Sequence, residues 1–120
     1  MNVDGLNKTA SAIVSTGKGI LAADESTPTI KKRFDTIGVE STETNRKNYR
    51  NMLFTTDGAS QYISGVILFD ETLRQLAGDG RSLSEMLSSE GIIPGIKVDA
   101  GAKDFAGFPG EKVTEGLDGL

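Results

Sequence analysis

The chain has 120 residues, 37% of them hydrophobic and 25% charged, which is the composition of one soluble globular unit. Its 17 acidic and 13 basic residues give a net charge of −4, which argues against nucleic acid or an anionic membrane as the main partner. Because the sequence contains no Cys and no His, disulfides, thiolate chemistry and the usual zinc sites are excluded, and we expect no metal site.

The first two predicted elements are a helix and a strand. Apolar residues in the segment 6–14 recur at helical spacing, and Gly17 can end this helix as its C′ residue. The short apolar run 20–23 follows, and we expect a strand that is buried on both faces. It ends at the adjacent carboxylates Asp24 and Glu25. In parallel α/β folds ligands bind at this carboxyl edge of the sheet.

Two further helices are predicted before the next strand. Thr27 is a suitable N-cap and Pro28 suits the first helical position, which predicts a helix over residues 29–37 with free N–H groups facing the carboxyl edge. A third helix begins at Ser41 or Thr42 and ends before Asp57. The predicted inward residues of the first of these helices are Ile30, Phe34 and Ile37. In the other helix, Tyr49, Met52 and Leu53 form the predicted apolar stripe, and Arg46 and Arg50 lie around it.

A second strand is predicted over residues 62–69, and it too ends in acids. These are Asp70 and Glu71, which we expect to pair with cations at the strand ends. Ser82 is a good cap for the next helix, which Gly91 can end.

The third predicted strand, residues 92–98, ends at Asp99 and contains Lys97. A lysine inside a buried strand is costly unless it faces a polar opening or a partner, so this lysine is a candidate functional residue. The Gly-rich segment 101–119 predicts a long loop, and Asp118 could cap a helix that the sequence does not complete.

Three strands with helices between them, each followed by carboxylates, predict a parallel sheet with a functional carboxyl edge. We expect the α/β fold class and interpret residues 1–120 as a single partial domain, the first three β/α units of a (β/α)8 TIM barrel. The competing architecture is a small doubly wound domain, which would need a Gly-rich turn after its first strand; residues 24–26 are Asp, Glu and Ser instead.

Four segments, taken together, resemble class I fructose-1,6-bisphosphate aldolase: residues 19–27, 65–73, 95–99 and 116–120. This family is a (β/α)8 barrel that cleaves fructose 1,6-bisphosphate through a Schiff base on a lysine, without a metal or another cofactor. The resemblance implies that this lysine belongs to a strand beyond Leu120. The chain then corresponds to an N-terminal piece that is inactive alone, from a family that forms homo-oligomers (tetramers).

The resemblance also implies roles for individual residues. Asp24 matches an active-site aspartate that assists proton transfer and orients the substrate hydroxyls, and Lys97 matches a lysine of the active site. The residues that match positions for binding the substrate or its phosphates are Ser26, Thr29, Arg33 and Arg46.

Structural interpretations of the same residues remain open at this point. Asp24 could belong to a plain strand-end acidic pair, Thr29 could be a first-turn capping residue, and Arg33 and Arg46 could be solvated charges on helix faces. The chain could also be a non-catalytic binding or assembly module, or belong to another sugar-phosphate enzyme on the same barrel.

The longest apolar run, residues 65–69, is too short to span a bilayer, and residues 1–8 lack a signal-peptide core, so we expect a cytoplasmic protein.

Overall fold

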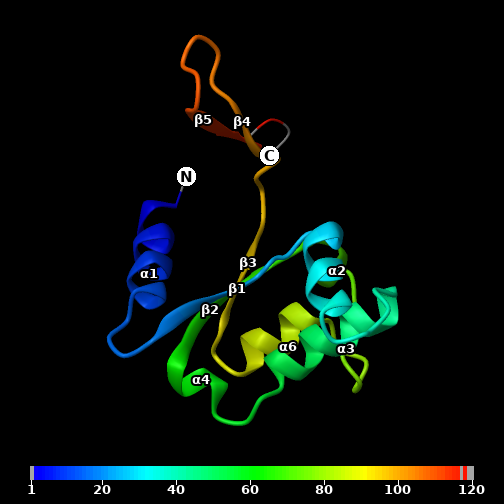
Figure 1. Ribbon diagram of the computed structural model, residues 1–120. Coiled ribbons are helices and arrows are strands. Elements are labelled where there is room, and N and C mark those ends of the chain that lie inside the picture. Colours follow the sequence, from blue (N-terminus) through cyan, green and yellow to red (C-terminus); the bar gives the residue numbers. More distant parts are fainter. Residues whose placement is uncertain (1, 117, 119–120) are drawn as a thin grey trace.

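A three-stranded parallel sheet organises the chain (Figure 1). The computed structural model describes residues 2–116 and 118. In chain order its elements are α1 (Val3–Ile13), β1 (Gly19–Ala23), α2 (Thr27–Asp35), α3 (Glu43–Phe54), α4 (Ala59–Tyr62), β2 (Ile63–Leu68), α5 (Asp70–Leu73), α6 (Leu83–Ser89), β3 (Ile93–Ile96), β4 (Gly101–Asp104) and β5 (Lys112–Glu115). Each helix in this described part of the chain is too short or too polar to cross a bilayer.

The strand order in the sheet is β1-β2-β3, with both pairs parallel. Strands that are consecutive in the sequence are therefore neighbours in space, as in a (β/α)8 barrel. A doubly wound sheet reverses its strand order at a switch point, and these three strands show no reversal. The three predicted strands are thus confirmed, with ends that differ from the predicted ones by one or two residues.

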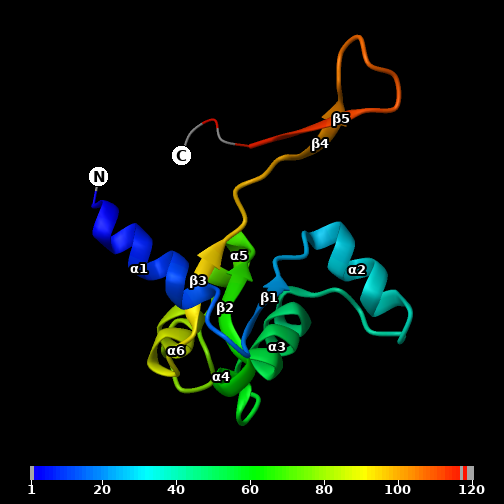
Figure 2. The same ribbon diagram turned by 90° about the vertical axis from the view of Figure 1, so that its left-hand side faces the viewer.

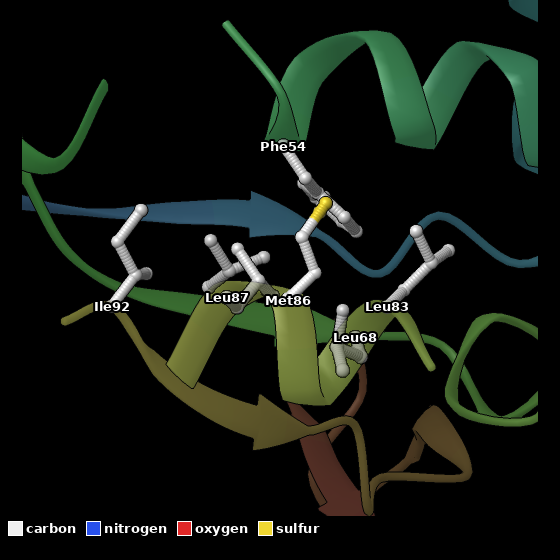
Figure 3. Packing of buried hydrophobic residues seen from close by; sticks show 8 residues of the cluster. Phe54, Leu68, Leu83, Met86, Leu87 and Ile92 are labelled. Atoms are coloured by element: carbon white, nitrogen blue, oxygen red, sulfur yellow. The ribbon is translucent and has the colours of Figure 1, made fainter. Parts of the chain in front are cut away.

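One face of the sheet carries the hydrophobic core. The buried side chains of the core cluster come from β1, β2, α3, α6 and the residue before β3: Ala23, Phe54, Val66, Leu68, Leu83, Met86, Leu87 and Ile92. Phe54 of α3 points toward Met86 of α6, so the two helices share one core on this face of the sheet (Figure 3). Burial of each large apolar side chain contributes about 1.5–3 kcal/mol relative to its exposure.

The opposite face of the sheet is largely uncovered. Ile20 of β1 is 52% exposed and Ala22 is exposed as well, whereas Leu21 and Ala23 face the core side. The prediction that β1 is buried on both faces was therefore wrong. The two crossover helices α3 and α6 both lie on the core side, whereas the end of α1 touches β2 on the other side, where Ile13 lies against Gly65.

The N-caps of α3 and α6 agree with the sequence pattern, and that of α2 does not. Thr42 caps α3 by accepting a hydrogen bond from the N–H of Asn45, and Ser82 forms a complete capping box with Glu85. The cap of α2 is Ser26, one residue before the predicted Thr27. Its hydroxyl makes no capping bond to the backbone and instead lies 3.1 Å from the Thr29 hydroxyl.

Several predicted inward and capping positions were wrong. Ile37 lies beyond the end of α2 and is 70% exposed, and Met52 is 57% exposed on α3. The inward face of α3 is shifted toward Arg50 and Phe54, which are the buried residues of this helix. Gly17 does not end α1, which stops at Ile13, and instead takes a positive φ in the turn before β1.

The predicted loop 101–119 contains a β-hairpin. Strands β4 and β5 pair in antiparallel fashion, and the Phe105 and Phe108 rings stack in the connection with centroids 4.9 Å apart. Figures 1 and 2 both show this hairpin standing away from the sheet. Because the segment is rich in glycine, its sequence lacks the alternation of apolar and polar residues that predicts a strand. The predicted cap Asp118 is described, but residues 117, 119 and 120 lie outside the described part.

Candidate active site

Asp24 and Lys97 meet at the carboxyl edge of the sheet. Asp24 is the first residue after β1 and Lys97 the first after β3. Counting from the paired residues Ala22, Ile67 and Gly95, both side chains belong to the uncovered face, since alternate residues share a face. The Lys97 Nζ lies 3.7 Å from the Asp24 Oδ2, and the two side chains are 25% and 24% exposed. The fold thus brings the two predicted catalytic residues together at a partly solvated position.

Asp99 is the second partner of the Lys97 ammonium. The two side chains form a hydrogen-bonded ion pair. This hydrogen bond raises the pKa of Lys97 and lowers the pKa of Asp99. Lys97 is therefore a cation at neutral pH, suited to binding an anion or donating a hydrogen bond rather than to acting as a free amine nucleophile.

The first turn of α2 presents two hydroxyls and one arginine. Ser26 and Thr29 lie 3.1 Å apart through their hydroxyls, and Arg33 follows one turn later with a side chain that is 57% exposed. Fewer backbone N–H groups are free to bind an anion here than predicted. Pro28 has no N–H, and the N–H of Thr29 donates to the Ser26 carbonyl. Anion binding here would rest on the hydroxyls and the guanidinium. Arg33 also pairs with Glu25, whose side chain is only 6% exposed.

Arg46 lies apart from these hydroxyls, in a partly buried ion pair on α3. Its Nε and Nη2 donate to the two carboxylate oxygens of Glu71 at 2.8 and 2.5 Å, and its Nη1 donates to the Ser41 carbonyl at 2.5 Å. The hydrogen bond from Arg46 lowers the pKa of Glu71. The expectation that Glu71 pairs with a cation is confirmed, and Arg46 is not a solvated charge, because its side chain is 11% exposed.

Arg50 is the residue that sequence reasoning missed. Its side chain is fully buried, and it donates to the carbonyl oxygens of Ala23 at 3.3 Å and of Glu25 at 2.6 Å. Burial lowers its pKa. Arg50 stands four residues after Arg46 and four before Phe54, so the three side chains share one face of α3.

Five side chains form what we call the charge network: Arg33, Glu25, Arg50, Glu71 and Arg46. Charges alternate along it, with Arg50 at the centre, 3.8 Å from a Glu25 oxygen and 3.6 Å from a Glu71 oxygen. Arg33 and Arg46 occupy its two ends. The network joins the two predicted phosphate-binding arginines to the backbone beside Asp24.

Elsewhere, the described residues form a cavity but no metal-binding cluster. A cavity of about 380 Å³ lies at the opposite end of the sheet, between residues that precede β2, such as Asp57 and Gly58, and residues that precede β3, such as Glu90 and Ile92. Within residues 2–116 and 118, no group of three or more acidic side chains is placed to hold a metal ion. The contacts among Asp24, Lys97 and Asp99 make the carboxyl edge the candidate site.

Comparisons with known proteins agree on one family. The model of the family "Glycolytic", described as fructose-bisphosphate aldolase class-I, matches residues 5–120. The chain is 58% identical over its whole length to a probable fructose-bisphosphate aldolase class 1 of Xanthomonas campestris pv. campestris, covering 36% of that protein. It is 56% identical over 117 residues to fructose-bisphosphate aldolase 7, cytosolic, of Arabidopsis thaliana, covering 98% of this chain and 33% of that protein.

A solved structure gives the same answer for the fold. The fructose-bisphosphate aldolase of Plasmodium falciparum, in a ternary complex with TRAP and a small-molecule inhibitor, matches with a TM-score of 0.90 and 53% identity. The match covers 97% of this chain and 33% of that one, so the chain spans about a third of the length of these relatives. The predicted barrel segment is confirmed, and the chain belongs to the class I fructose-bisphosphate aldolase family.

Proposed function

We propose that this chain supplies part of the active site of an enzyme that reversibly cleaves fructose 1,6-bisphosphate into dihydroxyacetone phosphate and glyceraldehyde 3-phosphate. The observation that carries the proposal is the contact between Asp24 and Lys97, 3.7 Å apart at the carboxyl edge of the sheet. In barrel enzymes this edge holds the catalytic residues. The Schiff-base lysine would come from a strand outside residues 1–120, and no metal would take part.

In this proposal Asp24 handles a proton and Lys97 supplies a positive charge. Aldol cleavage breaks a carbon–carbon bond while a substrate hydroxyl loses its proton, and a carboxylate fixed at a strand end can assist that transfer. The Lys97 ammonium can donate hydrogen bonds to substrate oxygens in the same opening. Its pairing with Asp99 keeps it charged and directed toward this edge.

A phosphate group of the substrate would bind at the start of α2. The Ser26 and Thr29 hydroxyls and the exposed guanidinium of Arg33 are the available donors. Arg33 uses one nitrogen for Glu25 and keeps other N–H groups for an anion. Arg46 would contribute less directly, because all three of its guanidinium nitrogens already donate to Glu71 and Ser41.

The assembly and location are part of the same proposal. A sugar bisphosphate is the expected substrate, and a homo-oligomer, such as a tetramer, is the expected assembly. The uncovered face of β1 supports the view that further parts of the protein pack against this chain. The expected location is the cytoplasm, in line with the word cytosolic in the name of the Arabidopsis relative.

The test uses the full-length protein that contains this chain. Asp24→Asn should lower kcat about 10²- to 10⁴-fold, the usual effect of losing an acid–base group. Asp70→Asn is the matched control, because this carboxylate is 65% exposed and pairs only with Arg74 among the residues described. An Asp24→Asn enzyme with normal kcat and a raised KM would make Asp24 a binding residue.

A trapping experiment tests the division of roles between lysines. Borohydride reduction with dihydroxyacetone phosphate should attach the substrate to a lysine outside residues 1–120, as peptide mapping by mass spectrometry can establish. An adduct on Lys97 would contradict the roles proposed here. Full activity on a different sugar phosphate, and none on fructose 1,6-bisphosphate, would favour another enzyme of the same barrel class.

A further inference from the structure

We infer that Arg50 is a positioning residue for Asp24: its buried guanidinium holds the backbone on both sides of this carboxylate. The inference rests on the proposed function, because Asp24 must act in catalysis for its position to matter. Arg50 itself touches no reacting atom in this scheme. It would act only through the geometry of Asp24.

The geometry is that of a clamp. Arg50 Nε donates to the carbonyl oxygen of Ala23 and Nη2 to that of Glu25, the two residues that flank Asp24. One rigid, planar guanidinium therefore joins the last residue of β1 to the second residue beyond it. The pairing of β1 with β2 ends at Ala23. Beyond it, the Arg50 side chain holds the backbone of Asp24 and Glu25 in place.

Burying the charge of Arg50 costs free energy of desolvation, and two nearby carboxylates and an aromatic ring partly offset this cost. Its side chain is 0% exposed, with Glu25 and Glu71 oxygens at 3.8 and 3.6 Å and the ring of Phe69 5.8 Å from the guanidinium carbon. Its Nη1 has no hydrogen-bond partner among the described residues. Buried ion pairs are often no more stabilising than apolar residues of similar volume. Stability alone therefore does not account for an arginine at this position.

A lysine could not do the same work. Its ammonium is a single point of donation on a flexible stem, whereas the two carbonyls need donors a fixed distance apart. Arg50→Lys keeps the charge of the network but removes the clamp. A displacement of about 1 Å at a catalytic group can cost about 10²-fold in rate.

The network also supplies a variant that should fold. Three arginines and two glutamates leave one positive charge in excess, and Arg50→Gln brings this balance to zero. Glu25 keeps Arg33 as its partner and Glu71 keeps Arg46. Arg50→Gln therefore leaves both carboxylates paired with an arginine, while it removes the two-carbonyl clamp.

The experiment measures kcat and KM of the full-length enzyme for Asp24→Asn, Arg50→Lys, Arg50→Gln and the double variant Asp24→Asn/Arg50→Lys. We expect each Arg50 variant to lower kcat about 10- to 100-fold, with KM changed less than 3-fold. The double variant should be no slower than Asp24→Asn alone, because both changes act through one carboxylate. The matched control is Phe54→Leu, a buried change one turn later on α3, which should leave kcat unchanged.

Each result has a defined meaning. Absence of aldolase activity in the wild type, or a normal kcat in Asp24→Asn, would reject the proposed function and, with it, the inference that Arg50 positions a catalytic carboxylate. A slow Asp24→Asn together with a normal Arg50→Lys, or additive losses in the double variant, would reject the clamp alone. If neither Arg50 variant folds, as judged by circular dichroism, while Phe54→Leu does, Arg50 is a stability residue and the inference is wrong.

Discussion

Glu71 and Asp70 are adjacent carboxylates on α5 with very different surroundings, and this difference predicts the effect of neutralising each one. Glu71 accepts two hydrogen bonds from Arg46 at 2.8 and 2.5 Å in a pair whose side chains are 23% and 11% exposed. Breaking a fully buried pair costs about 3–5 kcal/mol, and the residual exposure here reduces this to about 2–3 kcal/mol. Asp70→Asn should leave stability unchanged, because its partner Arg74 is 72% exposed.

The assay is urea unfolding of full-length wild type, Glu71→Gln and Asp70→Asn at one protein concentration. The pH dependence adds a second check. Arg46 lowers the pKa of Glu71 below its ordinary value of 4.5, so the stabilisation is complete above this value. It is lost as the pH falls toward the lower pKa of the folded state. The gap between wild type and Glu71→Gln should therefore narrow below pH 4.5. Equal effects of the two substitutions, or a gap that does not change with pH, would refute this reasoning.

Three further predictions concern binding, core packing and the hairpin. Arg33→Ala should raise KM for the bisphosphate with kcat nearly unchanged, the pattern of lost ground-state binding; steady-state kinetics that show a lower kcat would contradict it. Leu83→Ala, at a fully buried core position, should cost about 2–4 kcal/mol in urea unfolding. Gly116→Ala should displace the β4–β5 hairpin and remove its hydrogen-exchange protection, because φ is +139° there and a Cβ would overlap the backbone of residues 98–100. Gly78→Ala, with open space around it, should leave that protection intact.

Local signals in the sequence were sufficient for the three strands of the parallel sheet and for the starts of α3 and α6. The capping box at Ser82 and the cap at Thr42 depend on residues three positions apart, so the pattern alone identifies them. The contact between Asp24 and Lys97 could be expected for a different reason. Both follow apolar strands directly, and parallel strands bring their carboxyl ends to one edge.

The burial of Arg50 could not be predicted in this way. It depends on Glu25 and Glu71, which approach α3 only after β1 and β2 have paired. An arginine next to an apolar stripe is normally solvated. Helical periodicity therefore predicted an inward face of α3 that includes Met52, about one residue away from the observed face, which includes Arg50 and Phe54. The hairpin was missed for another reason: antiparallel pairing of four-residue strands in a Gly-rich segment gives almost no periodic signal.

The pairing of β1 with β2 also bears on how the protein is made. Gly19 pairs with Ile63, so a ribosome must synthesise more than forty residues after β1 before this strand can find its neighbour. In the described part of the chain, β1 and β3 each pair only with β2, and their outer edges keep unpaired backbone groups that another strand can join. During synthesis these edges and the exposed Ile20 are accessible to other nascent chains. Slow elongation or a bound chaperone should therefore favour correct assembly, whereas rapid overproduction of this segment should favour insoluble aggregates.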